Sequence, residues 1–375
     1  MNDRERFCET LLFGEPDRIP FAPGGPREST RAKWKEQGLD DPTRFMSALF
    51  EILGFRPDPP KQPGTVPGVS FQMLPRFEEK VLEHRDGHYI VRDWMGAITE
   101  ISDTYDYTYI RSAKDFVTRK WHKFPVESRE DWEEMKRRFD PTTPGRFPAD
   151  FEQRCGRNKG RDTVVGIHFN GPFWQMREWC GFEGLCIKMV EEPEFVDEMA
   201  QFWTDFCSAT MKPILDHMQL DYVYFSEDMA YKEHSMISPA MCRRWLQPAY
   251  ERWIAEARAG GCTVIDMDSD GKVDELIPIW IDAGIDVCDP IEVAAGNDIV
   301  AYRERFGHKM AYKGGVDKRA IAKGGEVIEA ELDRVRPVAE DGGYIPGCDH
   351  GVPPDISWPD FVHYARRLAE MTGWL

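Results

Sequence analysis

From about residue 160 to its C-terminus, the 375-residue chain alternates short apolar segments with amphipathic segments, and this rhythm restricts the fold more than any other feature. Strands separated by helices through short connections form a parallel sheet that the helices cover. The pattern therefore predicts an α/β fold. The predicted strands are 164–169, 222–225, 263–265, 285–287, 310–312 and 342–345, and the predicted helices are one that begins at Pro193, then 238–257, 274–283, 298–306, 319–339 and 358–371.

Counting strands favours a closed barrel over an open sheet. Six predicted strands follow residue 160, residues 18–21 supply a seventh, and an eighth between residues 40 and 75 would close the barrel. A doubly wound open sheet is the alternative, but it is expected to carry a glycine-rich phosphate loop after its first strand. The segment FAPGGP at 21–26 is not followed by helix-opening glycines. We therefore predict a (β/α)8 TIM barrel in which residues 1–375 form a single domain.

The first 160 residues are irregular and rich in proline. Residues 57–125 are expected to form an irregular insert, and its loosest part, residues 57–64, is expected to be a surface loop. Within the insert, residues 90–94 and 98–101 flank a short Met-Gly-Ala turn and predict an antiparallel hairpin. Residues 127–138 predict a short charged helix, because Ser128 and Asp131 have the spacing of a capping box.

The charge of the chain excludes some partners. Lys and Arg number 48 and Asp and Glu 66, so the net charge is −18, which argues against nucleic acid or an anionic membrane as the main partner. No apolar run is long enough to span a bilayer, and the charged N-terminus lacks the apolar stretch of a signal peptide. The nine cysteines form no CxxC pair. We therefore expect a cytoplasmic protein with free thiols.

Polar and titratable side chains follow each predicted strand of the second half. The active site of a TIM barrel lies at the carboxyl ends of its strands, so these side chains should meet at one rim. A single Asp at such a place is also explained by a turn or a helix cap, and only the clustering indicates a site. The residues concerned are His168 and Asn170, Ser226, Glu227 and Asp228, Asp266, Asp268 and Asp270, Asp289 and Glu292, Asp317, and Cys348, Asp349 and His350.

The segment DMDSDG at 266–271 resembles the opening of a helix–loop–helix calcium site, but its twelfth position is Ile277 instead of glutamate, so that interpretation fails. In an extended segment Asp268 and Asp270 project to the same side. Two carboxylates on one side suit a divalent metal, or raise each other's pKa for acid–base chemistry. Cys348 and His350 are candidates for the further ligands of a metal.

Several motifs together resemble the uroporphyrinogen decarboxylase superfamily. They are EPDRIP at 15–20, Asp270-Gly271, DPIE at 289–292, GGVDK at 314–318 and GYIPGCDH at 343–350, and the resemblance covers essentially the whole chain. It implies a (β/α)8 barrel with its site at the carboxyl rim. It also implies one of two chemistries: metal-free decarboxylation of uroporphyrinogen, or methyl transfer to or from a corrinoid, usually at a zinc site.

The resemblance to the decarboxylase branch is the weaker one. True decarboxylases carry an R-Q-A-G-R-Y stretch whose arginines hold the carboxylates of the substrate. The corresponding residues 24–30 read GGPREST, which leaves Arg27 alone, in a protein of net charge −18. A substrate with eight carboxylates would meet an unfavourable field there. Decarboxylation of a tetrapyrrole or a smaller acid is kept as an alternative.

The methyltransferase branch takes its zinc ligands from an H-x-C-G segment and a later G-C segment. Here DSDG at 268–271 and Gly347-Cys348 stand at those places. The resemblance thus implies a divalent metal, with zinc the first expectation, held by Asp268, Asp270, Cys348 and His350. This harder ligand set suits an oxygen or nitrogen leaving group better than a thiol acceptor. The implied function is transfer of a methyl group from a small methylated compound to a corrinoid carried by a separate protein, because the chain has no D-x-H-x-x-G motif of its own.

Roles are assigned to the remaining rim residues on the same basis. We predict that Glu227, Asp228 and His168 serve acid–base chemistry, with Asp228 raising the pKa of Glu227. Glu227 is alternatively a fourth metal ligand. Arg27, Asn170, Trp174 and Asp289 are expected to bind substrate; the aromatic stretch 168–174 suits a flat or methylated ligand, or equally plain core packing. A non-catalytic binding protein with a decayed metal site and a homo-oligomeric assembly both remain open.

Overall fold

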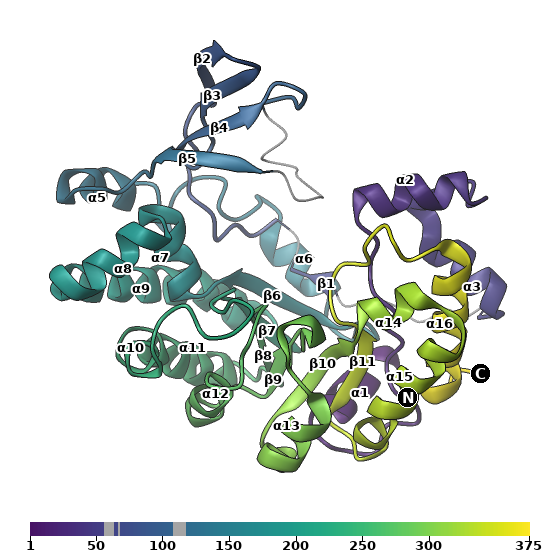
Figure 1. Cartoon of the computed structure of the whole chain (residues 1–375). Coiled ribbons are helices and arrows are strands. Elements are labelled where there is room, and N and C mark those ends of the chain that lie inside the picture. The colour runs from purple at the N-terminus through teal and green to yellow at the C-terminus, as the bar shows by residue number, and fades with distance from the viewer. Residues whose placement is uncertain (56–63, 67, 108–117) are drawn as a thin grey trace.

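Seven parallel strands form the centre of the computed structural model, which describes residues 1–55, 64–66, 68–107 and 118–375 (Figure 1). They are hydrogen-bonded in chain order, which confirms the predicted α/β architecture of the TIM-barrel type. The strands are β1 (Gly64–Thr65), β6 (Val165–Asn170), β7 (Tyr222–Ser226), β8 (Val264–Asp268), β9 (Val287–Asp289), β10 (Ala311–Val316) and β11 (Tyr344–Cys348).

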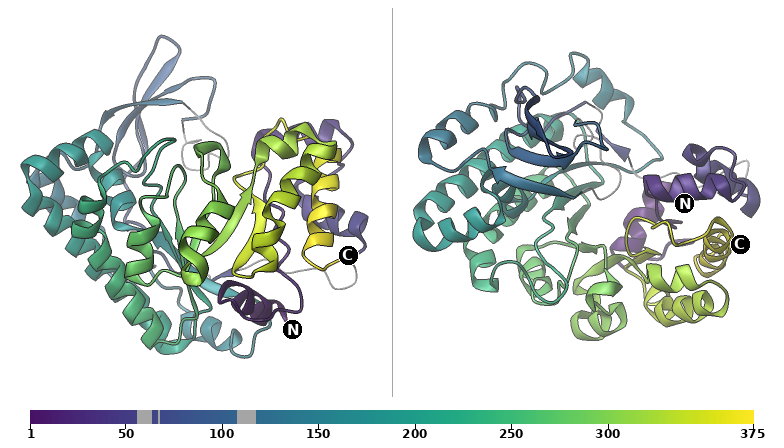
Figure 2. Two further views of the ribbon diagram at one scale, coloured as in Figure 1. Left: turned by 60° about the horizontal axis from the view of Figure 1, so that its bottom comes forward. Right: turned by 45° about the horizontal axis from the view of Figure 1, so that its top comes forward.

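Helices surround the strands as an outer layer (Figure 2). Each buries its apolar stripe; on α9, for example, Val196, Met199 and Trp203 are buried at spacings of three and four residues. The helices of the second half are α7 (Pro172–Cys180), α8 (Phe182–Glu191), α9 (Pro193–His217), α10 (Pro239–Trp245), α11 (Gln247–Ala259), α12 (Ile277–Ala283), α13 (Ile299–Phe306), α14 (Lys318–Lys323), α15 (Gly325–Glu340) and α16 (Trp358–Met371).

The N-terminal part supplies helices and a second sheet. The helices are α1 (Asp3–Leu11), α2 (Glu28–Glu36), α3 (Phe45–Leu53), α5 (Arg129–Lys136) and α6 (Phe151–Arg157), and short 3-10 turns cover Pro42–Arg44, Val293–Ala295 and Gly307–Lys309. Helix α5 begins at the predicted capping box of Ser128 and Asp131. The antiparallel sheet consists of β2 (Lys80–Arg85), β3 (His88–Arg92), β4 (Ile98–Ser102) and β5 (Arg119–Lys123).

This antiparallel sheet confirms the predicted hairpin and extends it. Strands β3 and β4 pair as expected, with Val91 opposite Thr99. Strands β2 and β5 were not predicted, because most of their residues are exposed and the sequence shows no alternation of apolar and polar residues there. Of the loop expected at 57–64, residues 57–63 lie outside the described residues, and so does 108–117 of the insert.

The prediction of a strand at residues 18–21 is wrong. In the structure this segment has no ladder partner, and the chain beyond it makes one parallel bridge, between Pro26 and Val352 beside the end of β11. Pro20, Pro23 and Pro26 have no N–H to donate, which explains why the segment lies against β11 without forming a strand. The strand expected between residues 40 and 75 is β1, which pairs with β6. Among the described residues no ladder joins β1 to β11.

Two long predicted helices are each divided in the structure. The helix expected over 319–339 is interrupted at Gly324, whose φ of +70° lies in the left-handed region that glycine adopts without strain. The helix expected over 238–257 is interrupted at Leu246, and Pro248 stands in the first turn of α11, where its missing N–H has no partner to lose. In the first of these helices, the Gly324-Gly325 pair is the sequence feature that indicates the end of α14, although the apolar periodicity continues across it.

The interior is apolar and rich in aromatic rings. Six tryptophans are fully buried, namely Trp34, Trp132, Trp179, Trp203, Trp253 and Trp280. The nine cysteines are free thiols, and most are buried, as predicted. No helix in the described part of the chain combines the length and the apolar character that crossing a bilayer requires.

Candidate functional site

The register of the parallel strands gathers polar side chains at their carboxyl ends. Asn170 of β6 lies opposite Ser226 of β7, Ser226 opposite Asp268 of β8, and Asp268 opposite Asp289 of β9. Two residues earlier on each strand, and therefore on the same face, His168, Tyr224 and Asp266 form a second row. The structure thus brings together residues that were predicted from four separate segments of the sequence.

A lysine that was not predicted connects the two rows. Nζ of Lys313 on β10 lies 2.7 Å from Oδ2 of Asp266 and 2.8 Å from Oδ2 of Asp289, and Tyr224 donates a hydrogen bond of 3.2 Å to Asp289. Burial raises the pKa of Asp266 to about 7, against the opposing effect of Lys313. Burial lowers the pKa of Lys313, but the two carboxylates raise it by more and hold the ammonium protonated.

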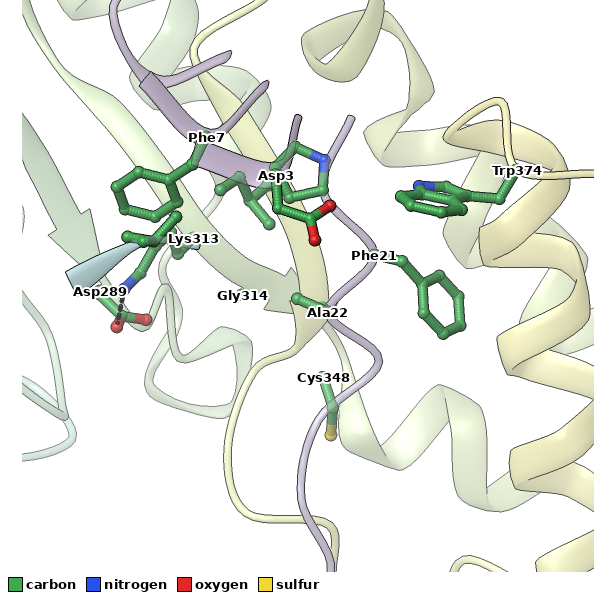
Figure 3. A pocket seen from close by; sticks show the side chains of 13 residues that line it. Asp3, Phe7, Phe21, Ala22, Asp289, Lys313, Gly314, Cys348 and Trp374 are labelled. Carbon is green, nitrogen blue, oxygen red and sulfur yellow. Dashed lines mark ion pairs between the residues drawn. The ribbon is translucent and has the colours of Figure 1, made fainter. Parts of the chain in front are cut away.

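Figure 3 shows the cavity that this ion pair faces. Its volume is about 280 Å³, and its walls come from both ends of the chain, including Phe21, Trp374 and Cys348. The side chain of Cys348 points away from the Lys313–Asp289 ion pair (Figure 3). The predicted substrate-binding residue Asp289 therefore lies in a cavity, but its nearest charged partner is Lys313.

Three side chains of the two rows form a hydrogen-bonded chain: Ser226 and Asp268 of the first row and His168 of the second. Oγ of Ser226 donates to Oδ2 of Asp268 at 2.6 Å, and Nε2 of His168 lies 2.9 Å from Oγ of Ser226. Burial, and then the charge of Asp289, raises the pKa of Asp268 to about 7. Burial lowers the pKa of His168, so the imidazole is neutral at pH 7. Because a hydroxyl both donates and accepts, this chain can pass a proton between Asp268 and His168.

The four predicted metal ligands do not converge. Nδ1 of His350 lies 3.4 Å from Oδ1 of Asp270, whereas Asp268 is bonded to Ser226 and Cys348 is buried beside Gly24. In the part of the chain that the structure describes, no three His, Cys, Asp or Glu side chains form a group that could hold a metal ion. Burial also raises the pKa of the Cys348 thiol to about 12, which disfavours the thiolate that binds zinc. The arrangement does not fit the expected centre.

Glu227 has a different environment from the one expected of a catalytic acid. It is fully buried, and its carboxylate accepts hydrogen bonds from the backbone N–H of Trp174 (2.9 Å) and from the Tyr250 hydroxyl. Burial, not Asp228, raises its pKa to about 7. Asp228 is paired with Arg177 at 2.9 Å. Glu227 therefore holds the first turn of α7 and Asp228 its last turn, and neither side chain lines the cavity beside Lys313.

Arg27, the remaining predicted substrate ligand, lies at the same rim. It precedes α2, its N–H donates to the carbonyl oxygen of Val352, and its side chain lies beside Gly351. Its charge contributes to lowering the pKa of His350, although burial is the larger effect. Arg27 is thus next to the loop after β11.

We expect Gly171→Ala to destabilise the fold, because of its contact with Glu227. A Cβ at position 171 would stand 2.1 Å from Cδ of Glu227, and the carboxylate cannot move without losing its two hydrogen-bond donors. Overpacking of this kind costs about 1–3 kcal/mol. Urea unfolding of Gly171→Ala and Gly184→Ala measures the effect; position 184 on α8 has only one neighbouring atom at ordinary contact distance. Equal stability of the two variants would contradict the arrangement.

A second cavity opens beside the chain of Ser226, His168 and Asp268. Its volume is about 410 Å³, and it brings together the predicted residues His168, Asn170 and Trp174. Glu178 of α7 also lines it and was not predicted; it accepts hydrogen bonds from the Trp174 indole (2.8 Å) and the Asn170 amide (3.2 Å). The spacing of Trp174 and Glu178, four residues apart on one helix, was the signal that could have revealed it.

These features define the class of the protein: a TIM-barrel-type α/β fold with its titratable groups at the carboxyl ends of the strands. Residues 122–364 match the family model described as uroporphyrinogen decarboxylase (URO-D). The chain belongs to this family. No curated protein matches the sequence.

The solved structures that this chain resembles are distant from it in sequence. A methyltransferase from Methanosarcina mazei is 14% identical, with 99% of this chain and 98% of that chain covered and a TM-score of 0.58. A B12-independent methionine synthase from Shewanella sp. W3-18-1 is 13% identical over 95% of this chain and 97% of that chain, with a TM-score of 0.41. The first similarity establishes a shared fold.

Proposed function

We propose that this protein transfers a methyl group from a small methylated compound to a corrinoid carried by a separate protein. The observation that carries the proposal is the charge of the site. Asp266, Asp268 and Asp289 surround one ammonium group, that of Lys313, which is already paired with two of them. A substrate with many carboxylates would be repelled there, whereas a neutral or cationic methylated compound would not. This argues against decarboxylation of a tetrapyrrole.

The residues of the site can supply what the leaving group needs. When the bond between the methyl group and oxygen or nitrogen breaks, its electron pair stays on the leaving atom, and cobalt(I) of the corrinoid supplies the pair for the new bond. The leaving atom then takes up a proton. His168, which lines the cavity, gives a proton to the leaving atom and receives another from Asp268 through Ser226, so the imidazole stays neutral. Asp268 ends deprotonated and recovers its proton from solvent.

The expected result is methylation of cob(I)alamin only when the protein and a methyl donor are both present. Phenyl methyl ethers, methylamines and betaines are offered as donors, and the reaction is followed by the absorbance change of the cobalamin. Omission of the protein, or of the reduced cobalamin, is the control. Consumption of uroporphyrinogen without any corrinoid would contradict the proposal. Failure of every donor, with both free and protein-bound corrinoid, would instead indicate a non-catalytic binding protein.

A further inference from the structure

Aromatic rings from several parts of the chain line the cavity next to His168. The segment before the antiparallel sheet, the β3–β4 turn and the segment after α5 contribute three rings, and β6, α7 and α9 contribute the others. The six rings are Phe71, Trp94, Phe139, Phe169, Trp174 and Trp203. At about 410 Å³ the cavity has the size of a small-molecule site.

Glu178 places a carboxyl group in the wall of this aromatic cavity, and burial raises its pKa, against the opposing effects of the Trp174 indole and the charge of Arg177. Its three hydrogen-bond donors are neutral: the Trp174 indole (2.8 Å), the Asn170 amide (3.2 Å) and the Gln175 amide (3.3 Å). The neighbouring guanidinium, that of Arg177, donates instead to the carbonyl and the carboxylate of Asp228, both at 2.9 Å. Among the described residues, no lysine or arginine forms an ion pair with Glu178, and the charges of Arg177 and Arg119 act on it only from a longer distance.

We propose that this cavity binds the methylated ammonium group of a cationic substrate, an inference that rests on the proposed methyl transfer and names its donor. The negative faces of aromatic rings attract a quaternary or protonated methylammonium group, and a carboxylate at the cavity wall compensates its charge. A cation in the cavity stabilises the ionised form of Glu178, which burial opposes, whereas a neutral ether does not and an anion would be repelled by it. The residues that line the cavity therefore favour a cation over a neutral ether and over an anion.

The position of His168 makes this ligand suitable for the reaction. Breaking the C–N bond of an ammonium group leaves the electron pair on a neutral amine nitrogen, while the methyl group bonds to cobalt(I), which supplies that bond's electron pair. The amine nitrogen is basic, and a proton from His168 captures its lone pair and opposes the reverse transfer. His168 and Glu178 line the same cavity, so one site holds the cation and protonates the product.

Direct binding measurements test the inference without any corrinoid. Tetramethylammonium and choline are titrated calorimetrically against the full-length protein, with 3,3-dimethylbutanol as the neutral isostere of choline and anisole as the neutral aromatic ether. We expect both cations to bind at least tenfold more tightly than the two neutral compounds. Comparable binding of choline and its neutral isostere, or binding of anisole alone, would overturn the inference. This comparison requires no variant.

Two variants locate the binding in this cavity. Glu178→Gln keeps the size of the side chain and removes its charge, and Phe71→Leu removes a ring while the site stays apolar; each should weaken tetramethylammonium binding at least tenfold. Glu183→Gln, an exposed charge change on α8, is the matched control and should bind as the native protein does. Unchanged affinity in both cavity variants would overturn the inference. Thermal melting confirms that each variant is folded.

Failure of the inference and failure of the proposed function give different results. If the cations bind as expected but no methyl group reaches cob(I)alamin, the cavity is correct and the proposed function is wrong. If methyl transfer occurs from phenyl methyl ethers and neither cation binds, the function stands and the substrate class is wrong. Transfer from a bound methylated ammonium compound, lost in Glu178→Gln and retained in Glu183→Gln, would support both.

Discussion

Replacing Lys313 with methionine should lower the free energy of unfolding at pH 7.5 by about 3 kcal/mol, the cost of leaving buried charges without their partner. Asp266 is 1% exposed, and its Oδ2 depends on the ammonium at 2.7 Å; its other oxygen has no hydrogen-bond partner among the described residues. Methionine fills a similar volume, so the loss of unfolding free energy is caused by the missing charge and not by a cavity. Urea unfolding measures it, with Lys309→Met, at an exposed position, as the control.

The pH dependence of this loss distinguishes charge from packing. Burial already raises the pKa of Asp266 to about 7 in the folded protein, while an unfolded aspartate titrates near 4. Without the ammonium, ionised Asp266 is still more costly in the fold, so stability falls as the pH rises from about 4. The difference between Lys313→Met and the native protein should be largest above pH 7 and smallest near pH 4. A loss independent of pH, not reduced in Lys313→Met/Asp266→Asn, would contradict the charge cluster.

Lys313 and Glu178 also show why part of the site escaped prediction. Both stand inside regular elements, Lys313 in β10 and Glu178 in α7, whereas most of the predicted site residues stand at or just beyond the ends of strands. Lys313 meets Asp266 across 47 residues of chain, and only the register of β8, β9 and β10 determines that contact. Glu178 faces residues 69–73 and Trp94, whose position depends on irregular chain with no periodicity. The alternation of strands and helices could be predicted because it depends on neighbouring residues in the sequence. The contacts of Lys313 and Glu178 could not, because they join segments far apart in the sequence.

Glu227 illustrates a second reason why the site could not be predicted fully: the sequence does not show which face of a strand a side chain occupies. Side chains alternate between the two faces of a strand, and both faces of a strand in a parallel sheet are buried. The sequence YVYFSED therefore does not show whether Ser226 or Glu227 faces the site. In the structure Ser226 lies in the row with Asn170 and Asp268, and Glu227 faces α7 and Tyr250. A one-residue difference exchanges the roles of two polar side chains.

Asp268→Asn should lower the rate of methyl transfer about 100-fold, the lower end of what a positioned proton donor contributes. The amide keeps the shape of the side chain but does not release a proton to Ser226 at neutral pH. Ser226→Ala should cause a similar loss because it separates His168 from Asp268, and Ser226→Thr, which restores a hydroxyl, should recover part of the rate. Asp282→Asn, exposed on α12, is the control. Single-turnover methylation of cob(I)alamin measures each rate.

The pH profile decides whether Asp268 supplies the proton or merely orients its neighbours. Its pKa is about 7, raised by burial and by Asp289 and Asp270 and lowered by Ser226 and Lys313. The acid form is the active one, so the native rate should be constant in mild acid and fall as the pH rises through 7. His168, whose pKa is lowered, gains its charge only below that range. In Asp268→Asn the fall near pH 7 should disappear and leave a flat, slow rate. A fall that persists unchanged in this variant assigns the titrating group to another residue and removes Asp268 from the proton path, because an amide has no proton to lose at that pH.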